Sequence, residues 1–134
     1  MRYWMVKFAP FRVSWEDILA SGKFEIYSVR NPQSRNNLEQ MKIGDLAFYY
    51  HSQTDKQVMG IMQVSKGAHQ DFTTSDPRWK SVTFEPIETL KRPISLNVIK
   101  DTEELRQIAL IHQPRLAVSE LTKEEYETLK QLSI

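Results

Sequence analysis

Short clusters of aromatic and β-branched residues alternate with polar segments along the chain, a pattern typical of strands joined by turns and small helices. The segment 3–8 predicts a strand, and so does the segment 24–29. Residues 43–52 predict a tight turn at Gly44 that leads into a buried strand, because apolar and aromatic residues follow the turn.

Two further segments predict strands in the middle of the chain. Residues 58–64 are expected to pair with the preceding buried strand as a hairpin whose polar tip lies at residues 53–57. After a turn-rich loop, the segment 79–90 alternates in polarity and places Val82 and Phe84 on one face of a strand.

Helix signals are clearest at two places. Ser14 can cap a short helix, with Asp17 at the position of a capping-box acid and Gly22 at the end of the helix. Thr122 and Glu125 form the same kind of box at the start of a C-terminal helix, which carries an apolar stripe.

Weaker helical segments complete the predicted fold. One short helix is expected to end near Met41, and a weakly helical region is expected between Pro93 and Arg106. Residues 1–134 therefore predict one α+β domain, a curled, mostly antiparallel β-sheet or open barrel of five or six strands with short surrounding helices.

Composition excludes several classes of protein. The chain is 40% hydrophobic and 26% charged, and no apolar stretch approaches the roughly 20 residues of a membrane-spanning helix. Residues 2–7 are strand-like, so no signal peptide is expected. The absence of cysteine excludes disulfides, thiolate metal sites and cysteine nucleophiles, and we expect a cytoplasmic location.

The formal net charge is only +1. A protein that grips a long nucleic acid through its phosphates is usually far more basic. If the ligand is a nucleic acid, the positive charge must be concentrated locally, or the affinity must come from the base itself.

The segment 29–38 is the most unusual of the chain, with two arginines and three asparagines directly after a predicted strand. Arginine offers a planar fork of donors, and asparagine pairs a donor with an acceptor; these groups match phosphates and base edges. The same residues also suit a solvated loop in which asparagines turn corners and cap the next helix. The residues alone leave both interpretations open.

Aromatic residues supply a second group of candidates. Tyr50, His51 and Ser52 end a predicted strand, where ligand-facing groups are common, although Tyr50 and His51 could equally lie in the core. Of the three tryptophans, Trp79 follows a turn-rich loop and is better placed at a pocket rim than Trp4. An indole at that rim could stack on a planar base, although most tryptophans are core residues.

Catalytic motifs are absent from the sequence. The three histidines are far apart and show no metal-ligand spacing, and no serine elbow, P-loop or dinucleotide-binding motif occurs. The acidic clusters at 103–104 and 124–125 fall in first turns of predicted helices, where capping and the helix dipole explain them. We therefore expect no enzymatic activity, no cofactor and no metal.

In order and spacing, these segments resemble the EVE domain, a PUA-like family related to YTH domains and to the thymocyte nuclear protein family. The resemblance covers essentially the whole chain, and the Arg-Asn run followed by Gly-Asp and Tyr-His-Ser is its most specific part. The matching segments are 2–7 with Pro10, 14–17, 29–31, Gln33 with 35–38, 41–52, 58–61, 76–79, 90–94, 96–100 and 115–118.

The resemblance implies a curled sheet with a pocket that opens at one face. Members of the family resemble proteins that bind modified bases, including 5-methylcytosine and its oxidised forms in DNA. The related YTH domains bind methylated adenine in RNA. Such recognition implies base flipping, in which the base leaves its stack at a cost of about a few kcal/mol and enters a pocket.

Carried over residue by residue, the resemblance assigns a floor strand, a wall segment and a facing strand end to the pocket. The pocket residues it implies are Lys7, Phe8, Val29, Arg30, Asn31, Tyr50, His51 and Ser52, with Trp79 as the stacking residue. Arg35 and Asn36 are expected to touch the flanking nucleic-acid backbone.

The chain departs from the family pattern near this expected pocket. Phe8 and Ala9 stand where the family commonly has a Ser/Thr-Glu pair, and Ser28 replaces the usual glycine. Pro32 and Ser34 replace an aromatic residue and an alanine. These differences bear on which base is accepted more than on the fold.

The sequence therefore predicts a non-catalytic reader of a modified base in DNA or RNA, expected to be a monomer without a membrane partner. The alternative is a sensor of a small molecule or free nucleotide that uses the same pocket, which the near-neutral charge would suit. A third class, an RNA-modifying or hydrolytic enzyme, would need a catalytic constellation that the sequence does not contain.

Overall fold

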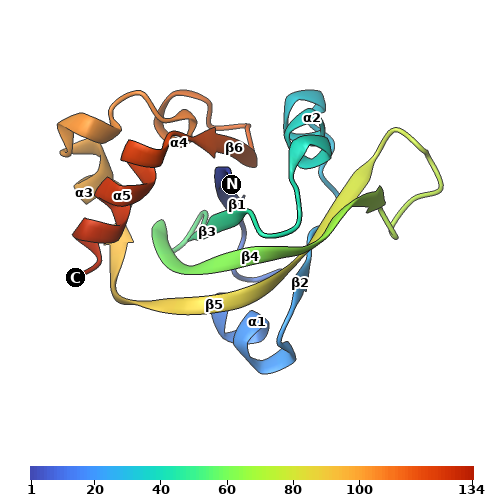
Figure 1. Ribbon diagram of the computed structural model, residues 1–134, viewed down its shortest axis with the longest axis horizontal. Coiled ribbons are helices and arrows are strands. Elements are labelled where there is room, and N and C mark those ends of the chain that lie inside the picture. The colour runs from blue at the N-terminus through green and yellow to red at the C-terminus, as the bar shows by residue number, and fades with distance from the viewer.

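The computed structural model describes all 134 residues and contains one six-stranded sheet surrounded by short helices (Figure 1). The strands are β1 (Tyr3–Phe8), β2 (Phe24–Glu25), β3 (Leu46–His51), β4 (Gln57–Gln70), β5 (Lys80–Ser95) and β6 (Val118–Leu121). Their order is β2-β5-β4-β3-β1-β6, and every neighbouring pair is antiparallel except β1 with β3. The predicted fold class is confirmed.

The helices are short, and the two that follow Ser14 and Thr122 begin where the sequence signals place them. They are α1 (Trp15–Ser21), α2 (Pro32–Gln40), α3 (Leu96–Lys100), the 3-10 helix η1 (Glu103–Leu105), α4 (Ala109–His112) and α5 (Lys123–Leu132). Both predicted capping boxes form, at Ser14 and at Thr122, and Gly22 ends α1 with a φ of 79°. None of the helices has the length and apolar character that a membrane crossing requires.

Both faces of the sheet are covered, because the side chains of successive strand residues point in opposite directions. On β1, Trp4 and Val6 belong to a core shared with α1 and α2, whereas Met5 belongs to a second core shared with α3, η1, α4 and α5. On β3, Tyr49 lies in the first core and Tyr50 in the second. Helices α3, α4 and α5 lie together at one end of the molecule in Figure 1.

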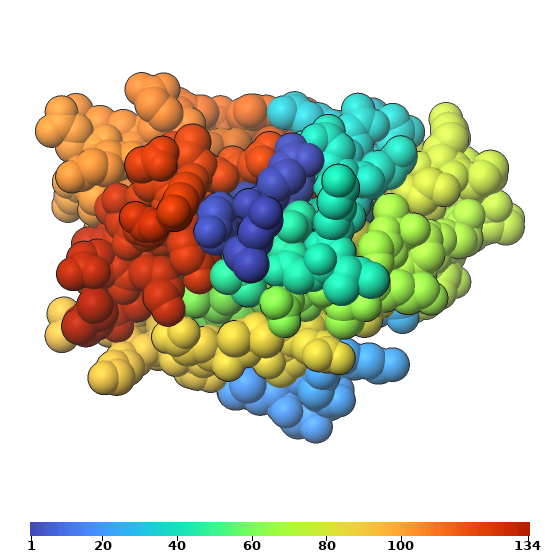
Figure 2. Space-filling view, in the orientation of Figure 1, coloured from blue at the N-terminus to red at the C-terminus, as the bar shows by residue number.

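The first strand is an interior strand of the sheet although it begins at the third residue of the chain. It lies between β3 and β6, with Tyr3 paired to Leu46 on one side and to Leu121 on the other. Figure 2 accordingly shows the first residues, in blue, between the red C-terminal helix and the blue-green segment that leads into β3.

The structure differs from the sequence prediction in the lengths of three strands. Strands β4 and β5 continue to Gln70 and Ser95, and their twisted hairpin projects from the body of the molecule in Figure 1. Beyond residue 64, β4 alternates between half-buried and exposed residues without apolar clusters, so its sequence carries little strand signal. Conversely, β2 ends at Glu25, and residues 27–31 leave the sheet to form a separate strap.

Candidate functional site

A strap of five residues, 27–31, crosses one end of the sheet between β2 and α2. Ser28 has a φ of 59°, in the left-handed region that favours glycine, so the chain turns sharply at this point. Val29 is buried, and Asn31 caps α2, since its side-chain oxygen accepts a hydrogen bond from the Ser34 N–H at 2.9 Å. The strap is therefore fixed by a core contact and by a helix cap.

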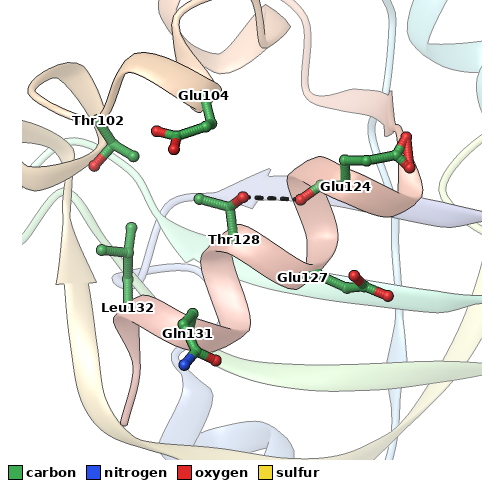
Figure 3. A pocket seen from close by; sticks show the side chains of 7 residues that line it. All are labelled: Thr102, Glu104, Glu124, Glu127, Thr128, Gln131 and Leu132. Atoms are coloured by element: carbon green, nitrogen blue, oxygen red, sulfur yellow. Dashed lines mark hydrogen bonds between the residues drawn. The ribbon is translucent and has the colours of Figure 1, made fainter.

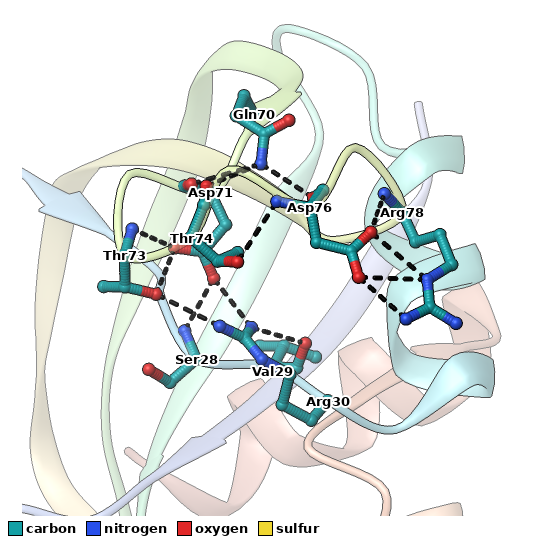
Figure 4. Close-up of polar contacts among 9 residues, drawn as sticks. All are labelled: Ser28, Val29, Arg30, Gln70, Asp71, Thr73, Thr74, Asp76 and Arg78. Atoms are coloured by element: carbon teal, nitrogen blue, oxygen red, sulfur yellow. Dashed lines mark hydrogen bonds and ion pairs between the residues drawn. The ribbon is translucent and has the colours of Figure 1, made fainter.

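The tip of the β4–β5 hairpin holds the strap from the other side (Figure 4). Asp71 is fully buried, and its Oδ2 accepts hydrogen bonds from the Ser28 N–H at 2.9 Å and from Arg30 Nη1 at 3.0 Å. Its Oδ1 accepts two hydrogen bonds from Thr73, from the backbone N–H and from the hydroxyl, both at 2.7 Å. One carboxylate thus ties the strap to the hairpin tip.

These bonds also set the ionisation of Asp71. Burial favours the neutral carboxyl, but the hydrogen bonds from Thr73, Arg30 and Ser28 outweigh it and hold the pKa of Asp71 below its ordinary value. The carboxylate is therefore charged at neutral pH and can pair with Arg30.

A pocket of about 240 Å³ opens between the strap and the ends of β1 and β3; we call it the strap pocket. Pockets for drug-sized ligands usually enclose about 300–1,000 Å³, so this one suits a single small ring system. Its lining residues are Lys7, Phe8, Ala9, Arg12, Tyr27, Ser28, Val29, Arg30, Asn31, Ser52, Gln53, Arg115 and Ala117.

One wall of the strap pocket offers flat, polarisable surfaces. The rings of Phe8 and Tyr27 lie 5.4 Å apart at an interplanar angle of 69°. The Arg12 guanidinium lies 4.3 Å from the Phe8 ring centre and 4.8 Å from that of Tyr27. Aromatic rings and guanidinium planes are the groups on which proteins stack single nucleobases.

The polar groups of the same pocket are only partly used by the protein. Because the Asn31 oxygen must accept from the Ser34 N–H, its amide nitrogen is left as a donor, and this nitrogen has no partner within the protein. The Ser52 hydroxyl likewise makes no hydrogen bond within the chain, although its backbone N–H donates to the Phe8 carbonyl. Ala9, Val29 and Ala117 add small apolar surfaces. The pocket can therefore stack a flat ring, donate to its edge and cover a small apolar substituent.

The structure brings six of the predicted pocket residues together. Those that line the strap pocket are Lys7, Phe8, Val29, Arg30, Asn31 and Ser52. Sequence reasoning did not single out Arg12, Tyr27 and Arg115, which also line it. No local signal marked them, because Arg12 lies in a turn, Tyr27 follows a two-residue strand and Arg115 is far from both in the sequence.

Tyr50 and His51 do not line the strap pocket, and as consecutive residues of a strand they face opposite sides of the sheet. Tyr50 points into the second core and lines a neighbouring pocket. His51 is buried, and its Nε2 accepts a hydrogen bond from the Trp15 N–H at 2.9 Å. The other nitrogen, Nδ1, therefore carries the proton and donates to Asp55 at 2.9 Å, so His51 anchors the start of α1.

Trp79 does not line the strap pocket either, since its half-buried ring lies at the base of the β4–β5 hairpin tip. Its stacking on a base stays a prediction. The guanidinium groups of Arg30, Arg35 and Arg78 lie 5.4–5.6 Å from its ring centre. Arg35 also lies 3.7 Å from Glu39, and the exposed Asn36 accepts hydrogen bonds from Arg35. Contact of Arg35 and Asn36 with a nucleic-acid backbone stays a prediction.

Positive charge is concentrated around the strap pocket. Two more hollows adjoin it: one shares Lys7, Ser52 and Gln53 with the strap pocket, and the next shares Lys100 and Ile111 with that one. No aspartate or glutamate lines any of the three. Their lysines and arginines are Lys7, Arg12, Arg30, Lys56, Lys100, Arg106 and Arg115.

Among these cations only Arg30 forms an ion pair within the protein, with Asp71. The others are free to meet an external anion. The near-neutral net charge of the chain therefore hides a strongly basic surface, which is the local concentration that binding of a polyanion requires.

Acidic side chains gather in a different hollow, between α5 and the segment that leads into η1 (Figure 3). It is lined by Glu104, Glu124 and Glu127, together with Thr102, Thr128, Gln131 and Leu132, and by no basic residue. This hollow would repel a polyanion, and it shares no residue with the three basic hollows.

The curled sheet and its single-ring pocket under a basic rim define a PUA-like binding domain. The EVE domain model matches residues 2–132, and the chain belongs to this family. Mouse thymocyte nuclear protein 1 is 30% identical over 97% of this chain and 73% of its own length. An uncharacterised protein of Schizosaccharomyces pombe is 32% identical over 88% of this chain, which spans 57% of that protein.

Solved structures show the same fold. A crystal structure of a protein from Agrobacterium tumefaciens superposes with a TM-score of 0.97 at 37% identity, covering 99% of this chain and 93% of that one. The structure of human thymocyte nuclear protein 1 (THYN1) in complex with DNA containing 5-methylcytosine superposes with a TM-score of 0.93 at 28% identity. It covers 99% of this chain and 98% of the human one.

Proposed function

We propose that this protein binds DNA and holds one flipped-out, modified base, such as 5-methylcytosine, in the strap pocket without chemical change. The observation that carries the proposal is the pocket itself, a single-ring cavity with free hydrogen-bond donors that adjoins two further hollows lined by lysines and arginines and by no acid. The structure of human THYN1 with 5-methylcytosine DNA supports DNA as the partner.

Each part of the pocket has a role in this proposal. Tyr27 and the Arg12 guanidinium stack on the flat face of the base, an interaction of about 1–3 kcal/mol per base. The free amide N–H of Asn31 donates to an acceptor on the base edge. The small apolar residues Ala9 and Val29 contact the methyl group.

The proposal is tested with oligonucleotides that differ only in one base, with cytosine, 5-methylcytosine or an oxidised derivative at the centre. Burial of one methyl group is worth about 0.8 kcal/mol, so we expect roughly fourfold tighter binding of the methylated strand. If no modified oligonucleotide binds better than its plain counterpart, the protein is not a reader of modified bases.

One substitution separates the pocket from the fold. Asn31→Asp keeps an oxygen that can cap α2 but removes the amide donor and adds a negative charge beside the base. We expect base binding to weaken tenfold or more, since a lost hydrogen bond is worth about 1–3 kcal/mol, with an unchanged melting temperature. Binding equal to that of the wild type would place the base elsewhere.

Salt dependence separates this function from the alternative, a sensor of a free nucleotide or small molecule. Polynucleotide binding releases counterions, so log K should fall with log salt with a slope of about −0.7 for each phosphate contacted on a single strand. A neutral small ligand would show almost no slope. The basic rim favours the polynucleotide, because a small ligand would use only the cations of one pocket.

Base flipping leaves a gap in a duplex, and Phe11 is placed to fill it. Its side chain is 74% exposed, and it directly precedes Arg12 of the pocket wall. Apolar side chains of this kind insert between base steps in other DNA complexes. We expect Phe11→Ala to weaken binding to a duplex but not to a single strand. The control is Ile43→Ala, since Ile43 is equally exposed, at 73%, and lines none of the three basic hollows.

A further inference from the structure

A second pocket of about 240 Å³ lies next to the strap pocket and shares Lys7, Ser52 and Gln53 with it. We call it the lysine pocket, because Lys56 and Lys100 also line it and no acidic residue does. Its remaining wall is apolar, formed by Leu96, Leu110, Ile111 and Pro114, and Tyr50 also lines it. The pocket thus combines a cationic side with an apolar side.

The polar groups of the lysine pocket are available to a ligand. Lys56 and Lys100 make neither an ion pair nor a side-chain hydrogen bond within the protein. Lys7 donates one hydrogen bond to the Pro114 carbonyl, and an ammonium group has two more protons to give. Burial lowers the pKa of Lys7, because the charged ammonium loses contact with water. An anion bound beside Lys7 would stabilise the charged form.

Tyr50 is the second sign of a site built for a ligand. Only 3% of its surface is exposed, and its hydroxyl forms no hydrogen bond within the protein. Burial raises the pKa of Tyr50 to about 12, so the hydroxyl stays protonated at neutral pH and can donate to an anion. The hydroxyl is reached by solvent, since the Ser81 hydroxyl is the only fully buried side-chain polar atom that lacks a partner, and it can therefore donate to a ligand in the pocket.

Carboxylates near this pocket are already engaged. Asp55 lies in the next hollow, beside Lys56 and Lys100, but accepts hydrogen bonds from His51 at 2.9 Å and from Thr54 at 2.7 Å. The hydrogen bonds from His51 and Thr54 lower the pKa of Asp55, which fixes its charge in that network. The three lysines therefore lack a carboxylate partner inside the lysine pocket.

We propose that the lysine pocket binds the nucleotide next to the flipped base, with its phosphate between Lys7, Lys56, Lys100 and the Tyr50 hydroxyl. The sugar or base of that nucleotide lies against the apolar wall formed by Leu110 and Ile111. This inference rests on the proposed function, because the lysine pocket adjoins the strap pocket at Lys7, Ser52 and Gln53, as a subsite for the neighbouring nucleotide must. The protein then reads a base in the context of its covalent neighbour, and a free base fills only half of the site.

The test uses a single-stranded trinucleotide with central 5-methylcytosine, in which either the 5′ or the 3′ phosphate is replaced by a neutral methylphosphonate. We expect the wild-type protein to lose about tenfold in affinity with one of the two replacements. The double variant Lys56→Gln, Lys100→Gln should bind the unmodified backbone about tenfold more weakly. The double variant should bind the phosphate and methylphosphonate backbones equally well. The slope of its log K against log salt should be smaller by about one.

Two further variants test whether the effect is specific to the lysine pocket. Tyr50→Phe removes only a hydroxyl that has no partner in the protein, so the fold should be unaffected while the preference for the charged phosphate falls. Lys91→Gln, Arg92→Gln removes the same charge from exposed residues of β5 that line none of the three basic hollows, and should leave the preference intact.

The outcomes separate the two proposals. A wild-type protein indifferent to both methylphosphonates, or a lysine variant as sensitive as the wild type, overturns the lysine pocket as the phosphate site. Equal binding of cytosine and 5-methylcytosine, with phosphate sensitivity that depends on Lys56 and Lys100, overturns modified-base reading but leaves the lysine pocket as a phosphate site.

Discussion

Replacing Asp71 by asparagine tests whether one buried carboxylate holds the strap over its pocket. Asparagine has the same shape but only one acceptor oxygen. If that oxygen stays with the two Thr73 donors, the new NH2 group faces the Ser28 N–H and Arg30 Nη1, which are both donors. Both hydrogen bonds to the strap are then lost.

The magnitude follows from the two bonds. A hydrogen bond to a charged group contributes about 1.5–3 kcal/mol. The Arg30 side chain is 40% exposed and can be hydrated in the variant, so its share is small. We expect Asp71→Asn to lower the free energy of unfolding by about 2–4 kcal/mol, or the melting temperature by about 10 °C for a domain of this size. Binding of the modified oligonucleotide should weaken as well, because the strap carries Arg30 and Asn31.

The pH dependence gives a second readout of the same group. The pKa of Asp71 is held below the ordinary value of about 3.9 in the folded protein, so its stabilisation is present above pH 4 and is lost as the pH falls through the folded pKa. The stability difference between wild type and Asp71→Asn should therefore be constant from about pH 5 to 8 and should shrink below about pH 4.

Asp76→Asn is the matched control, since Asp76 lies in the same loop but pairs with the largely exposed Arg78. It should change the melting temperature little. The reasoning would be refuted by an Asp71→Asn protein that melts within about 3 °C of the wild type and binds equally well, because the strap would then be held by other contacts.

Three further substitutions test the packing and the site. Gly60→Ala should destabilise the fold by about 3 kcal/mol in chemical denaturation, because the new Cβ would lie 2.2 Å from the buried Trp15 indole; Gly67→Ala, on the same strand with its nearest atom at 3.8 Å, should be tolerated. Ser28→Gly should leave stability unchanged or raise it by up to about 1 kcal/mol by relieving the left-handed backbone, and a larger loss would reveal a contact of the hydroxyl. Trp79→Ala should preserve the ratio of affinities for modified and plain oligonucleotides; a changed ratio would return Trp79 to the base site.

Several features of the fold were readable from the sequence because they depend on near neighbours. The segment 3–8 coincides with β1, and both capping boxes use residues only three positions apart. The long distal halves of β4 and β5 were missed, since polar, half-exposed residues lack the apolar alternation that identifies strands.

The polar run after β2 confirms one of the two interpretations that the residues left open, and the binding interpretation stays a prediction. Asn31 caps α2 with its oxygen, as a loop asparagine would, and it also lines the strap pocket. Arg30 donates one hydrogen bond to Asp71, which lies 41 positions away in the sequence. No local pattern could predict this contact. The separation of Tyr50 from His51, in contrast, follows from the two-residue period of any strand.

The sequence by itself determined where two of the helices begin, because capping is a local property, and its resemblance to a known family implied the class of domain and six of the residues that line the strap pocket. Only the tertiary structure decided that Arg12, Tyr27 and Arg115 join them, and that the acids gather elsewhere. The parallel pairing of β1 with β3 and the strap across their ends bring together groups from distant parts of the chain. Such meetings depend on how the strands pair and twist, which the order of residues along one segment does not express.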